Sequence, residues 1–461
     1  MKHYDLVVAG GGPAAITLAK MVGKTKKMAV IRPEEHSMIY CAMPYVLEGL
    51  IDMEKTLKKD DLVTNSGAEL IRGTITEINF EEKKVFLMNG AEIEYEQLVL
   101  ATGAVPFIPP IPGADLKGVT GFKTENDLKG IRELIAAGLK KAVVVGAGAI
   151  GIELSQALRE TGLEVDLVDM GASVLPNLVD PEMTEELEAE IIRRGVNLHL
   201  NAKVTALKGG QWVESVELDN GRSIHFDALD ECSESGAPAH DGIVIFAAGM
   251  KPQTDLVKDS GIDTGRDGIL INGKMETSLP DVFAVGDCAQ FVSGITGEAT
   301  PGKLATNAVP MAKILGFNLL GQDRTYPGFY NGAATKVGDY FVGGTGLSET
   351  AARAAGFEVI TGYSEVTTQF PIMPEAKRMQ IKLISEAGTK RLLGAQIVSG
   401  EPVTGRIDLL TFAIQQGAVA EELTSLSYSS QPYQSFFPAA NGVVLAAEDI
   451  LKKMEPVHAL A

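Results

Sequence analysis

The chain has 461 residues, a formal net charge of −19 at pH 7 and only three cysteines. Its length exceeds what one hydrophobic core usually organises, which predicts two or three domains. The acidic balance argues against a general affinity for nucleic acid or anionic membrane, because such surfaces need clustered basic residues. No stretch approaches ~20 uninterrupted apolar residues and no apolar leader precedes the first strand-like run, so we expect neither a membrane span nor a signal peptide. The cysteines are far apart and form no C-x-x-C pair, which indicates no metal site and fits a reducing cytoplasm.

A strand, a glycine-rich turn and a helix open the chain. The apolar run 4–9 predicts a strand, the motif GGGPAA follows at 10–15, the run 14–22 predicts a helix, and 28–31 predicts a second strand. The first glycine permits a tight turn, and the third lets backbone N–H groups approach a pyrophosphate at the helix N-terminus. The pattern predicts a dinucleotide site with the candidate residues Gly10, Gly12, Pro13, Ala14 and Ala15.

The acid that usually follows such a site at the end of the second strand is missing. Arg32 stands there, and the nearest acids are Glu34 and Glu35. We name Arg32 and Glu34 as candidates for contact with the adenosine ribose. A further strand is predicted over 97–101, and four prolines within 105–113 predict an extended linker after it.

The strand–turn–helix pattern then returns. A strand is predicted over 142–145, the motif GAGAIG occupies 146–151, a helix is predicted over 150–160 and a strand over 164–168. This is the complete dinucleotide fingerprint in its expected context. Asp169 ends the last strand, where an acid accepts hydrogen bonds from the ribose 2′-hydroxyl and repels a 2′-phosphate, so NADH should be preferred over NADPH. The candidate residues are Gly146, Gly148, Ile150, Gly151 and Asp169.

The last part of the chain has a different character. Strand-like segments at 336–343, 379–384 and 392–398 precede a helical run over 407–416. This order predicts a separate α+β domain.

These motifs resemble the pyridine nucleotide-disulfide oxidoreductases, flavoproteins with two dinucleotide sites. The turns at 101–103 and 247–249 look like the family's strand-end turns, and residues 277–287 look like its second flavin motif. The resemblance implies that the first site binds FAD and the second binds NADH, that Asp287 holds the ribityl chain and that the Leu304–Ala305 region faces the flavin ring. Glu153 resembles a glutamate near the nicotinamide, with an ordinary helix-surface acid as the alternative. The further candidate cofactor residues are Ala101, Thr102, Gly103, Gly249, Asp287, Leu304 and Ala305.

The resemblance also implies the domain organisation. The fold would be α/β, with two Rossmann-like domains for FAD and NAD and a C-terminal α+β dimerisation domain. The FAD-binding domain would comprise 1–115 and 242–325, the NAD-binding domain 116–241, and the dimerisation domain 326–461. The chain would act as a homodimer, or as a dimer of dimers.

One cysteine distinguishes the branch of the family. Cys41 stands alone in an S-x-x-x-C-x-x-P-Y context, whereas the dithiol members carry two cysteines. This context resembles the coenzyme A-disulfide reductases, NADH oxidases and NADH-dependent persulfide reductases. A helical run predicted from Ala42 to Leu50 would place the sulfur at a helix N-terminus, where the dipole stabilises a thiolate. A buried structural thiol is the alternative for Cys41, and it is the favoured interpretation of Cys232 and Cys288.

The proton donor for a leaving thiolate is sought near the C-terminal end of the chain. The dithiol members carry a His-Glu pair near the C-terminus, and the corresponding stretch 427–433 has no histidine. Tyr428 or Tyr433 of a partner subunit is the candidate acid, with aromatic packing at the dimer interface as the alternative.

Together these features predict an NADH-dependent reductase of persulfides, polysulfides or coenzyme A disulfide. Coenzyme A is a candidate substrate moiety, and a basic patch of Lys20, Lys24, Lys26 and Lys27 either meets its phosphates or is a solvated surface. One alternative is an NADH oxidase that reduces dioxygen through a sulfenic acid at Cys41. Pro13 lowers that alternative, because oxidase members often carry histidine there. Two further alternatives are a flavoprotein that donates electrons to a carrier protein and a redox sensor without turnover.

Overall fold

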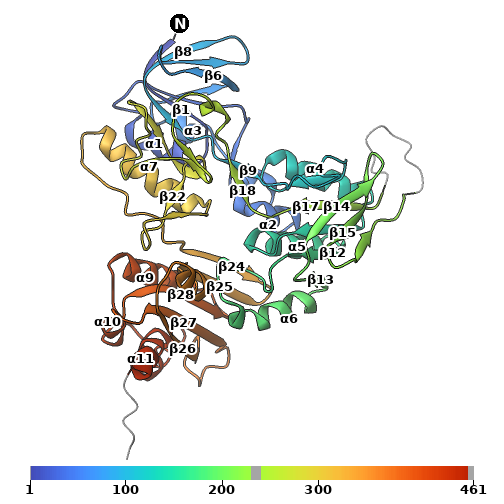
Figure 1. The fold of residues 1–461 in the computed structure, drawn as a ribbon, viewed down its shortest axis with the longest axis vertical. Helices are drawn as coiled ribbons and strands as arrows, with labels where there is room; N and C mark the ends of the chain where they lie inside the picture. Colours follow the sequence, from blue (N-terminus) through green and yellow to red (C-terminus); the bar gives the residue numbers. More distant parts are fainter. Residues whose placement is uncertain (1, 230–239, 455–461) are drawn as a thin grey trace, which may run out of the picture. The chain divides into compact units, whose positions relative to one another are not determined.

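The computed structural model describes residues 2–229 and 240–454 (Figure 1). The chain divides into two compact units. The first comprises Met1–Phe107, Lys123–Leu128 and Gly249–Phe329, and the second comprises Ile108–Phe122, Lys129–Ala248 and Tyr330–Ala461.

The first unit is organised around a seven-stranded sheet of order β5-β2-β1-β8-β7-β6, with β21 also paired to β8. Strands β5, β2, β1, β8 and β21 are parallel, while β7 and β6 add an antiparallel edge. All five residues of β2 are buried, as expected for a parallel strand covered on both faces. The strands are β1 (Lys2–Ala9), β2 (Met28–Arg32), β5 (Glu69–Arg72), β6 (Ile75–Asn79), β7 (Lys84–Leu87), β8 (Glu92–Leu100) and β21 (Val282–Ala284).

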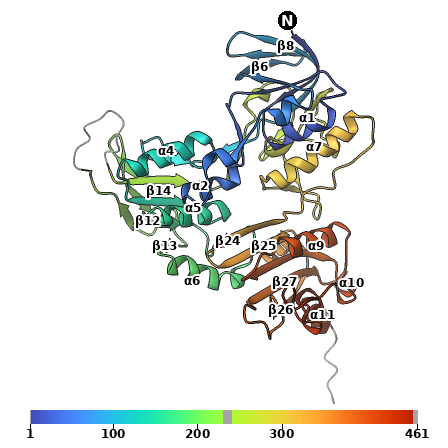
Figure 2. The same ribbon diagram turned by 180° about the vertical axis from the view of Figure 1, so that it is seen from behind.

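Two helices of this unit, α1 and α7, lie side by side in both ribbon views (Figures 1 and 2). Short elements complete the unit, and β3 pairs with β4 while β9 pairs with β18. The helices are α1 (Pro13–Val22), α2 (Met43–Leu47), α3 (Asp61–Thr64) and α7 (Ala305–Leu319). The short strands are β3 (Ser37–Met38), β4 (Leu57–Lys58), β9 (Ala104–Pro106), β18 (Met250–Pro252), β19 (Thr264–Gly265), β20 (Gly268–Ile269), β22 (Phe291–Val292) and β23 (Ala299–Thr300).

The second unit contains a parallel five-stranded sheet of order β10-β17-β11-β12-β13. Strand β17 pairs with both β10 and β11, so it belongs to this sheet. The domain boundary predicted at residue 242 is therefore wrong by one strand. The elements are β10 (Val119–Gly121), α4 (Glu125–Ala136), β11 (Lys141–Val145), α5 (Ala149–Glu160), β12 (Glu164–Val168), α6 (Glu185–Arg193), β13 (Val196–His199) and β17 (Gly242–Phe246), with a small antiparallel sheet of β14 (Val204–Gly209), β15 (Val213–Leu218) and β16 (Ser223–His225).

The C-terminal part of the second unit is an antiparallel sheet of order β24-β25-β28-β27-β26. Helix α11 packs on β26 and β27, and α9 packs on β25 and β28. The segment predicted as one strand over 336–343 is a hairpin, because Gly338 and Asp339 turn the chain between β24 and β25. The elements are β24 (Ala333–Val337), β25 (Tyr340–Gly346), α8 (Glu349–Ala354), β26 (Val359–Thr367), β27 (Arg378–Glu386), β28 (Leu392–Ser399), α9 (Thr404–Gln415), α10 (Ala420–Thr424) and α11 (Gly442–Met454).

Within the described residues, no helix combines the length and apolar character that a membrane crossing requires.

Candidate active site

The first glycine turn forms a cradle at the N-terminus of α1. Gly10 has φ of +123°, and a side chain there would overlap the carbonyl oxygen of Ala101. Gly12 is the N-cap of α1, and a Cβ atom at this position would meet no atom within 4 Å. The space beside Gly12 is therefore open where unpaired backbone N–H groups of the helix converge. Such a cradle fits a pyrophosphate.

The second glycine turn repeats this geometry at α5. Gly146 has φ of +114°, and Gly148 is the N-cap of α5 with open space around its Cα. A side chain at Gly151 would overlap the carbonyl oxygen of Gly146, so helix and strand approach closely. Ile150 faces outward, with 46% of its surface exposed. Two matching cradles in one chain fit two dinucleotides.

Asp287 follows β21, and its neighbour Gly286 lies close to α1 and α7. A Cβ atom on its neighbour Gly286 would lie 3.3 Å from Ala308 of α7 and 3.8 Å from Ala14 of α1. Asp287 Oδ1 is buried and accepts no hydrogen bond from the described residues, while Oδ2 lies 3.5 Å from Lys123 Nζ. An unused carboxylate oxygen beside the first cradle fits a ligand hydroxyl such as the ribityl chain of FAD.

The surrounding candidates lie in the same unit. Thr102 donates a hydrogen bond from Oγ1 to the carbonyl of Gln253 at 2.7 Å, which ties the predicted strand-end turn to the chain after Gly249. Leu304 is the N-cap of α7 and Ala305 is its first residue, so α7 also begins in this unit. Lys123 was not predicted, because only the fold brings it to Asp287.

Arg32 takes part in a charged cluster at the end of β2. Its guanidinium donates to Asp60 Oδ1 at 2.7 Å, and Asp60 Oδ2 accepts from Arg72 at 2.6 Å. A side chain at Gly11 would overlap the stem of Arg32, so this arginine lies against the first cradle. Its Nε is buried without a hydrogen-bond partner in the described chain. Glu34 is exposed, so the side chain lying against the cradle is Arg32.

Asp169 accepts hydrogen bonds from the backbone of the second cradle. Its Oδ2 accepts a hydrogen bond from the Ala147 N–H, and its Oδ1 accepts one from the Gly171 N–H, both at 2.6 Å. The carboxylate therefore orders the turn in addition to its predicted contact with ribose. Remaining lone pairs on both oxygens are available to a ribose hydroxyl.

Glu153 of α5 accepts a hydrogen bond from Thr335 of β24 at 2.6 Å. Burial raises the pKa of Glu153, and the Thr335 hydroxyl opposes this rise. Gln156, one turn along α5, donates to the Lys336 carbonyl at 3.1 Å. Helix α5 is thus joined to the C-terminal sheet, a connection that no local motif indicates.

Cys41 is exposed and lies in a 3₁₀ turn, Tyr40–Ala42. The predicted helix from Ala42 to Leu50 is wrong in length, because α2 spans only five residues. A dipole of so short a helix contributes little, and the structure supplies a different source of positive charge. Burial lowers the pKa of Lys58, the Cys41 thiolate opposes this shift, and Lys20 adds to it. Lys58 therefore lies within electrostatic range of this sulfur, and Lys20 lies within electrostatic range of Lys58.

The other cysteines differ from Cys41. Cys288 is fully buried, and its Sγ donates to the Leu100 carbonyl at 3.3 Å. Burial raises the pKa of the Cys288 thiol, which disfavours the reactive thiolate. Cys232 lies outside the described residues.

Both candidate tyrosines are exposed in the C-terminal domain. Tyr428 donates its hydroxyl to the Pro438 carbonyl at 2.5 Å, and 65% of the Tyr433 surface is accessible. Exposure of both rings fits either predicted role, as acid or as interface contact.

A group of acids in the second unit has spacing that suits a metal ion, namely Asp180, Glu182 and Glu349. The ammonium of Lys382 lies among them, 2.9 Å from Asp180 and 2.8 Å from Glu349, and it also contacts Glu182. Lys382 thus supplies the positive charge that these carboxylates need.

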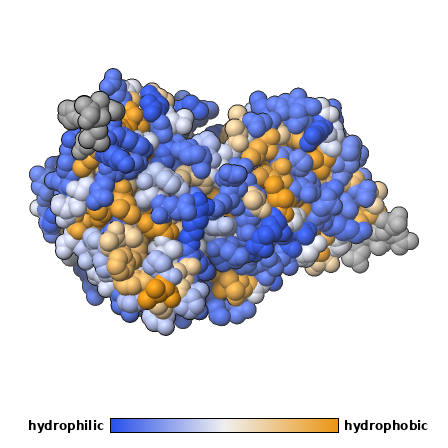
Figure 3. Space-filling view, turned by 90° about the horizontal axis from the view of Figure 1, so that it is seen from below, coloured by the Kyte–Doolittle hydropathy of each residue, from blue (hydrophilic) through white to orange (hydrophobic). Residues whose placement is uncertain are grey.

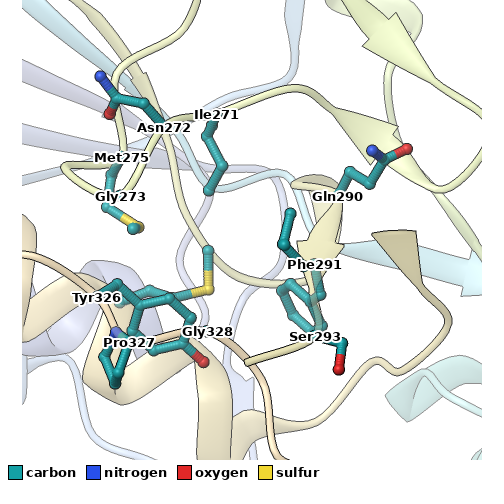
Figure 4. A pocket seen from close by; sticks show the side chains of 12 residues that line it. Ile271, Asn272, Gly273, Met275, Gln290, Phe291, Ser293, Tyr326, Pro327 and Gly328 are labelled. Atoms are coloured by element: carbon teal, nitrogen blue, oxygen red, sulfur yellow. The ribbon is translucent and has the colours of Figure 1, made fainter. Parts of the chain in front are cut away.

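A separate cavity of about 250 Å³ lies in the first unit (Figure 4). Met275, Phe291 and Tyr326 form its apolar walls, and Gln290 and Ser293 add polar groups. No predicted site residue lines it, so the chemistry developed below does not use it.

Comparison with protein families decides the identity of this fold. The pyridine nucleotide-disulphide oxidoreductase model matches residues 4–312, and the model of that family's dimerisation domain matches 333–436. The chain belongs to the pyridine nucleotide-disulphide oxidoreductase family. It is therefore an oxidoreductase, and the cofactors of this family are FAD and NAD(H), which fit the two cradles described above.

Individual relatives match nearly the whole chain. An NADH oxidase of Methanocaldococcus jannaschii is 34% identical, covering 97% of this chain and 99% of the relative. An NAD(P)H coenzyme A polysulfide/persulfide reductase of Pyrococcus horikoshii is 32% identical, covering 92% and 94%. The solved structure of an NAD-dependent persulfide reductase from A. fulgidus has a TM-score of 0.89 at 28% identity, covering 97% of this chain and 83% of that one. The predicted branch of the pyridine nucleotide-disulphide oxidoreductases is thereby confirmed.

Proposed function

We propose that this flavoprotein is an NADH-dependent reductase of persulfides, polysulfides or coenzyme A disulfide, with Cys41 as the attacking group. The observation that carries the proposal is an exposed cysteine near the positive charge of Lys58, in the same compact unit as the first cradle. Positive charge stabilises a thiolate, which is the nucleophilic form of the residue.

The residues of the two cradles have assigned roles in this proposal. Gly10 and Gly12 would receive the FAD pyrophosphate, Asp287 a ribityl hydroxyl, and Asp169 the ribose of NADH. Bound FAD supplies the two-electron chemistry that connects NADH oxidation to sulfur reduction. Glu153 would contact the nicotinamide region, with its carboxylate held by Thr335.

Cys41 would act by thiol–disulfide exchange. Its thiolate forms a bond to one sulfur of the acceptor, the acceptor's S–S bond breaks, and the other sulfur leaves as a thiolate that takes up a proton. A persulfide acceptor leaves Cys41 as a persulfide, and two electrons with a proton then return the thiolate and release hydrosulfide. A disulfide acceptor leaves a mixed disulfide that the same two electrons open.

The charge near Cys41 favours an anionic acceptor such as a coenzyme A derivative. Lys58 lies near the sulfur and Lys20 acts on Lys58, whereas Lys26 donates to Gln97 at 3.0 Å and Lys27 lies over the ring of Tyr4. Within the basic patch predicted from the sequence, it is therefore the Lys20 end that acts on Lys58. Phosphates of coenzyme A would bind at this end.

A homodimer belongs to the proposal. Exposed apolar side chains in the C-terminal domain support it, and apolar patches are visible among hydrophilic residues on the surface (Figure 3). The exposed apolar side chains of the C-terminal domain include Ile372, Leu409, Phe412, Tyr428, Tyr433 and Phe437. In such a dimer Tyr428 or Tyr433 would reach the partner's site. The cytoplasm remains the predicted location.

An NADH oxidase is the second candidate. The name of the M. jannaschii relative favours it, and an exposed Cys41 is able to form a sulfenic acid with hydrogen peroxide, the two-electron reduction product of dioxygen. Turnover with each acceptor separates the two candidates.

Anaerobic NADH oxidation with coenzyme A persulfide, glutathione persulfide, polysulfide and coenzyme A disulfide tests the proposal, with hydrosulfide measured in parallel. At least one acceptor should support turnover well above the aerobic oxidase rate, and Cys41→Ser should abolish it. Cys288→Ala is the matched control and should retain it. Faster turnover with dioxygen than with every sulfur acceptor would contradict the reductase function and support the NADH oxidase instead.

A further inference from the structure

A short antiparallel pair of strands, which no sequence motif indicates, brings Lys58 to the segment that carries Cys41. Strand β4 pairs antiparallel with β3, with Lys58 opposite Ser37 and Leu57 opposite Met38. The Ile39 N–H extends the pairing with a 2.8 Å hydrogen bond to the Thr56 carbonyl. The chain then turns through Tyr40–Ala42, so Lys58 lies across the hairpin from the residues that lead into Cys41.

The surroundings of Lys58 differ from those of an ordinary surface lysine. Its side chain is half-buried, and within the described parts of the chain no acid forms an ion pair with it. The charged groups that act on it are Cys41 and Lys20. Burial and Lys20 lower the pKa of Lys58 against the opposing effect of Cys41, which makes its ammonium a stronger acid than that of an exposed lysine.

We propose that Lys58 is the general acid that protonates the sulfur leaving the acceptor when Cys41 attacks. The inference rests on the proposed function and adds to it the identity of the proton donor. In the exchange the Cys41 thiolate forms the new S–S bond and the acceptor's S–S bond breaks with its electron pair on the departing sulfur. The Lys58 ammonium gives that sulfur a proton and becomes a neutral amine, and water returns the proton after Cys41 is reduced.

Proton donation and simple charge stabilisation make different demands on this side chain. An arginine keeps the positive charge but does not release a proton at neutral pH, and a methionine keeps neither property. The choice of acceptor provides a second comparison. An alkyl thiolate is a poor leaving group without a proton, whereas an aromatic thiolate leaves without one.

The test measures single-turnover reaction of oxidised holoenzyme with hydroxyethyl disulfide and with a nitrobenzoate disulfide at neutral pH. The background from Cys41→Ser is subtracted. For Lys58→Arg, the rate with the alkyl disulfide should fall about 10²-fold, in line with loss of a general acid, while the rate with the aromatic disulfide changes little. Lys58→Met should slow both reactions, and the exposed neighbour variant Lys59→Met should slow neither.

Two results would overturn the assignment. Parental rates for Lys58→Arg with both disulfides would make Lys58 only a charge partner of the sulfur. An equal loss with both would mean that the variant disturbs the site as a whole. Failure of the proposed function is recognised separately, since Cys41→Ser would then react as fast as the parent with both disulfides.

Discussion

Replacing Asp169 with asparagine should remove most of the discrimination between NADH and NADPH. The carboxylate stands at the end of β12, where a dinucleotide ribose is expected, and its charge repels a 2′-phosphate. Asparagine keeps the size of the side chain and one acceptor oxygen but removes the charge. The expected consequence is weaker binding of NADH and relatively stronger binding of NADPH.

The hydrogen bonds of Asp169 set the magnitude. It accepts two short bonds, from the N–H groups of Ala147 and Gly171, and asparagine is able to accept only one of them. A hydrogen bond to a charged group contributes about 1.5–3 kcal/mol. Losing one of these bonds lowers the free energy of unfolding by about that amount, whereas losing a charge-assisted bond to the ribose hydroxyl weakens NADH binding by roughly 10- to 150-fold, since each 1.4 kcal/mol is a factor of ten.

The assay is anaerobic reduction of the bound flavin at increasing NADH or NADPH, which yields a dissociation constant for each. Glu160→Gln is the matched control, because it removes one exposed acid from the far end of α5. Thermal unfolding and FAD content report whether the variant is intact. A variant that stays intact and keeps the parent's ratio of NADH to NADPH affinity would refute the role given to Asp169.

Three further expectations concern stability and the first cradle. Lys382→Met should lower the free energy of unfolding by about 3–5 kcal/mol in chemical denaturation, because it leaves buried Asp180 and its neighbours without a counter-charge. The control Lys390→Met, at a more exposed ion pair, should lower it by under about 1 kcal/mol. Burial tends to raise the pKa of both Asp180 and Glu349. The Glu349 backbone N–H and Lys382 outweigh it at Asp180, and Lys382 and Arg353 outweigh it at Glu349, so both pKa values lie below the ordinary 3.8 and 4.5. The stability they contribute is complete above those values and is lost as pH falls through the lowered ones, so the difference in unfolding free energy between the parent and Lys382→Met should be largest at neutral pH and should narrow in acid. Gly12→Val should yield a folded protein without FAD, because its side chain fills open cradle space, whereas Gly10→Val should fail to fold; a yellow, FAD-loaded Gly12→Val protein would contradict the cradle.

Local sequence patterns were sufficient to predict the two glycine-rich turns and the elements beside them. Turns of this kind are fixed by a few neighbouring residues, so the helix predicted over 14–22 and the strand predicted over 164–168 correspond to α1 and β12. The family resemblance and the cofactors rested on the same short motifs and are confirmed.

Other features depend on contacts between distant segments. Strand β17 belongs to the second sheet through its pairing with β11, which no composition change marks. Lys58 reaches the neighbourhood of Cys41 through the β3–β4 pairing of only two residues on each side. Thr335 meets Glu153 from a position 182 residues further along the chain. The helix after Cys41 was predicted too long, since Gly49 ends regular structure soon after Leu47.

The central claim is that a thiolate at position 41 exchanges electrons with the flavin, and anaerobic titration with NADH tests it most directly. With its flavin oxidised, the parent should show a long-wavelength thiolate–flavin charge-transfer absorbance that is lost as NADH reduces the flavin, that is absent from Cys41→Ser and that is present in Cys288→Ala. The same absorbance in Cys41→Ser, or none in a parent that still reduces its acceptor, would contradict the account.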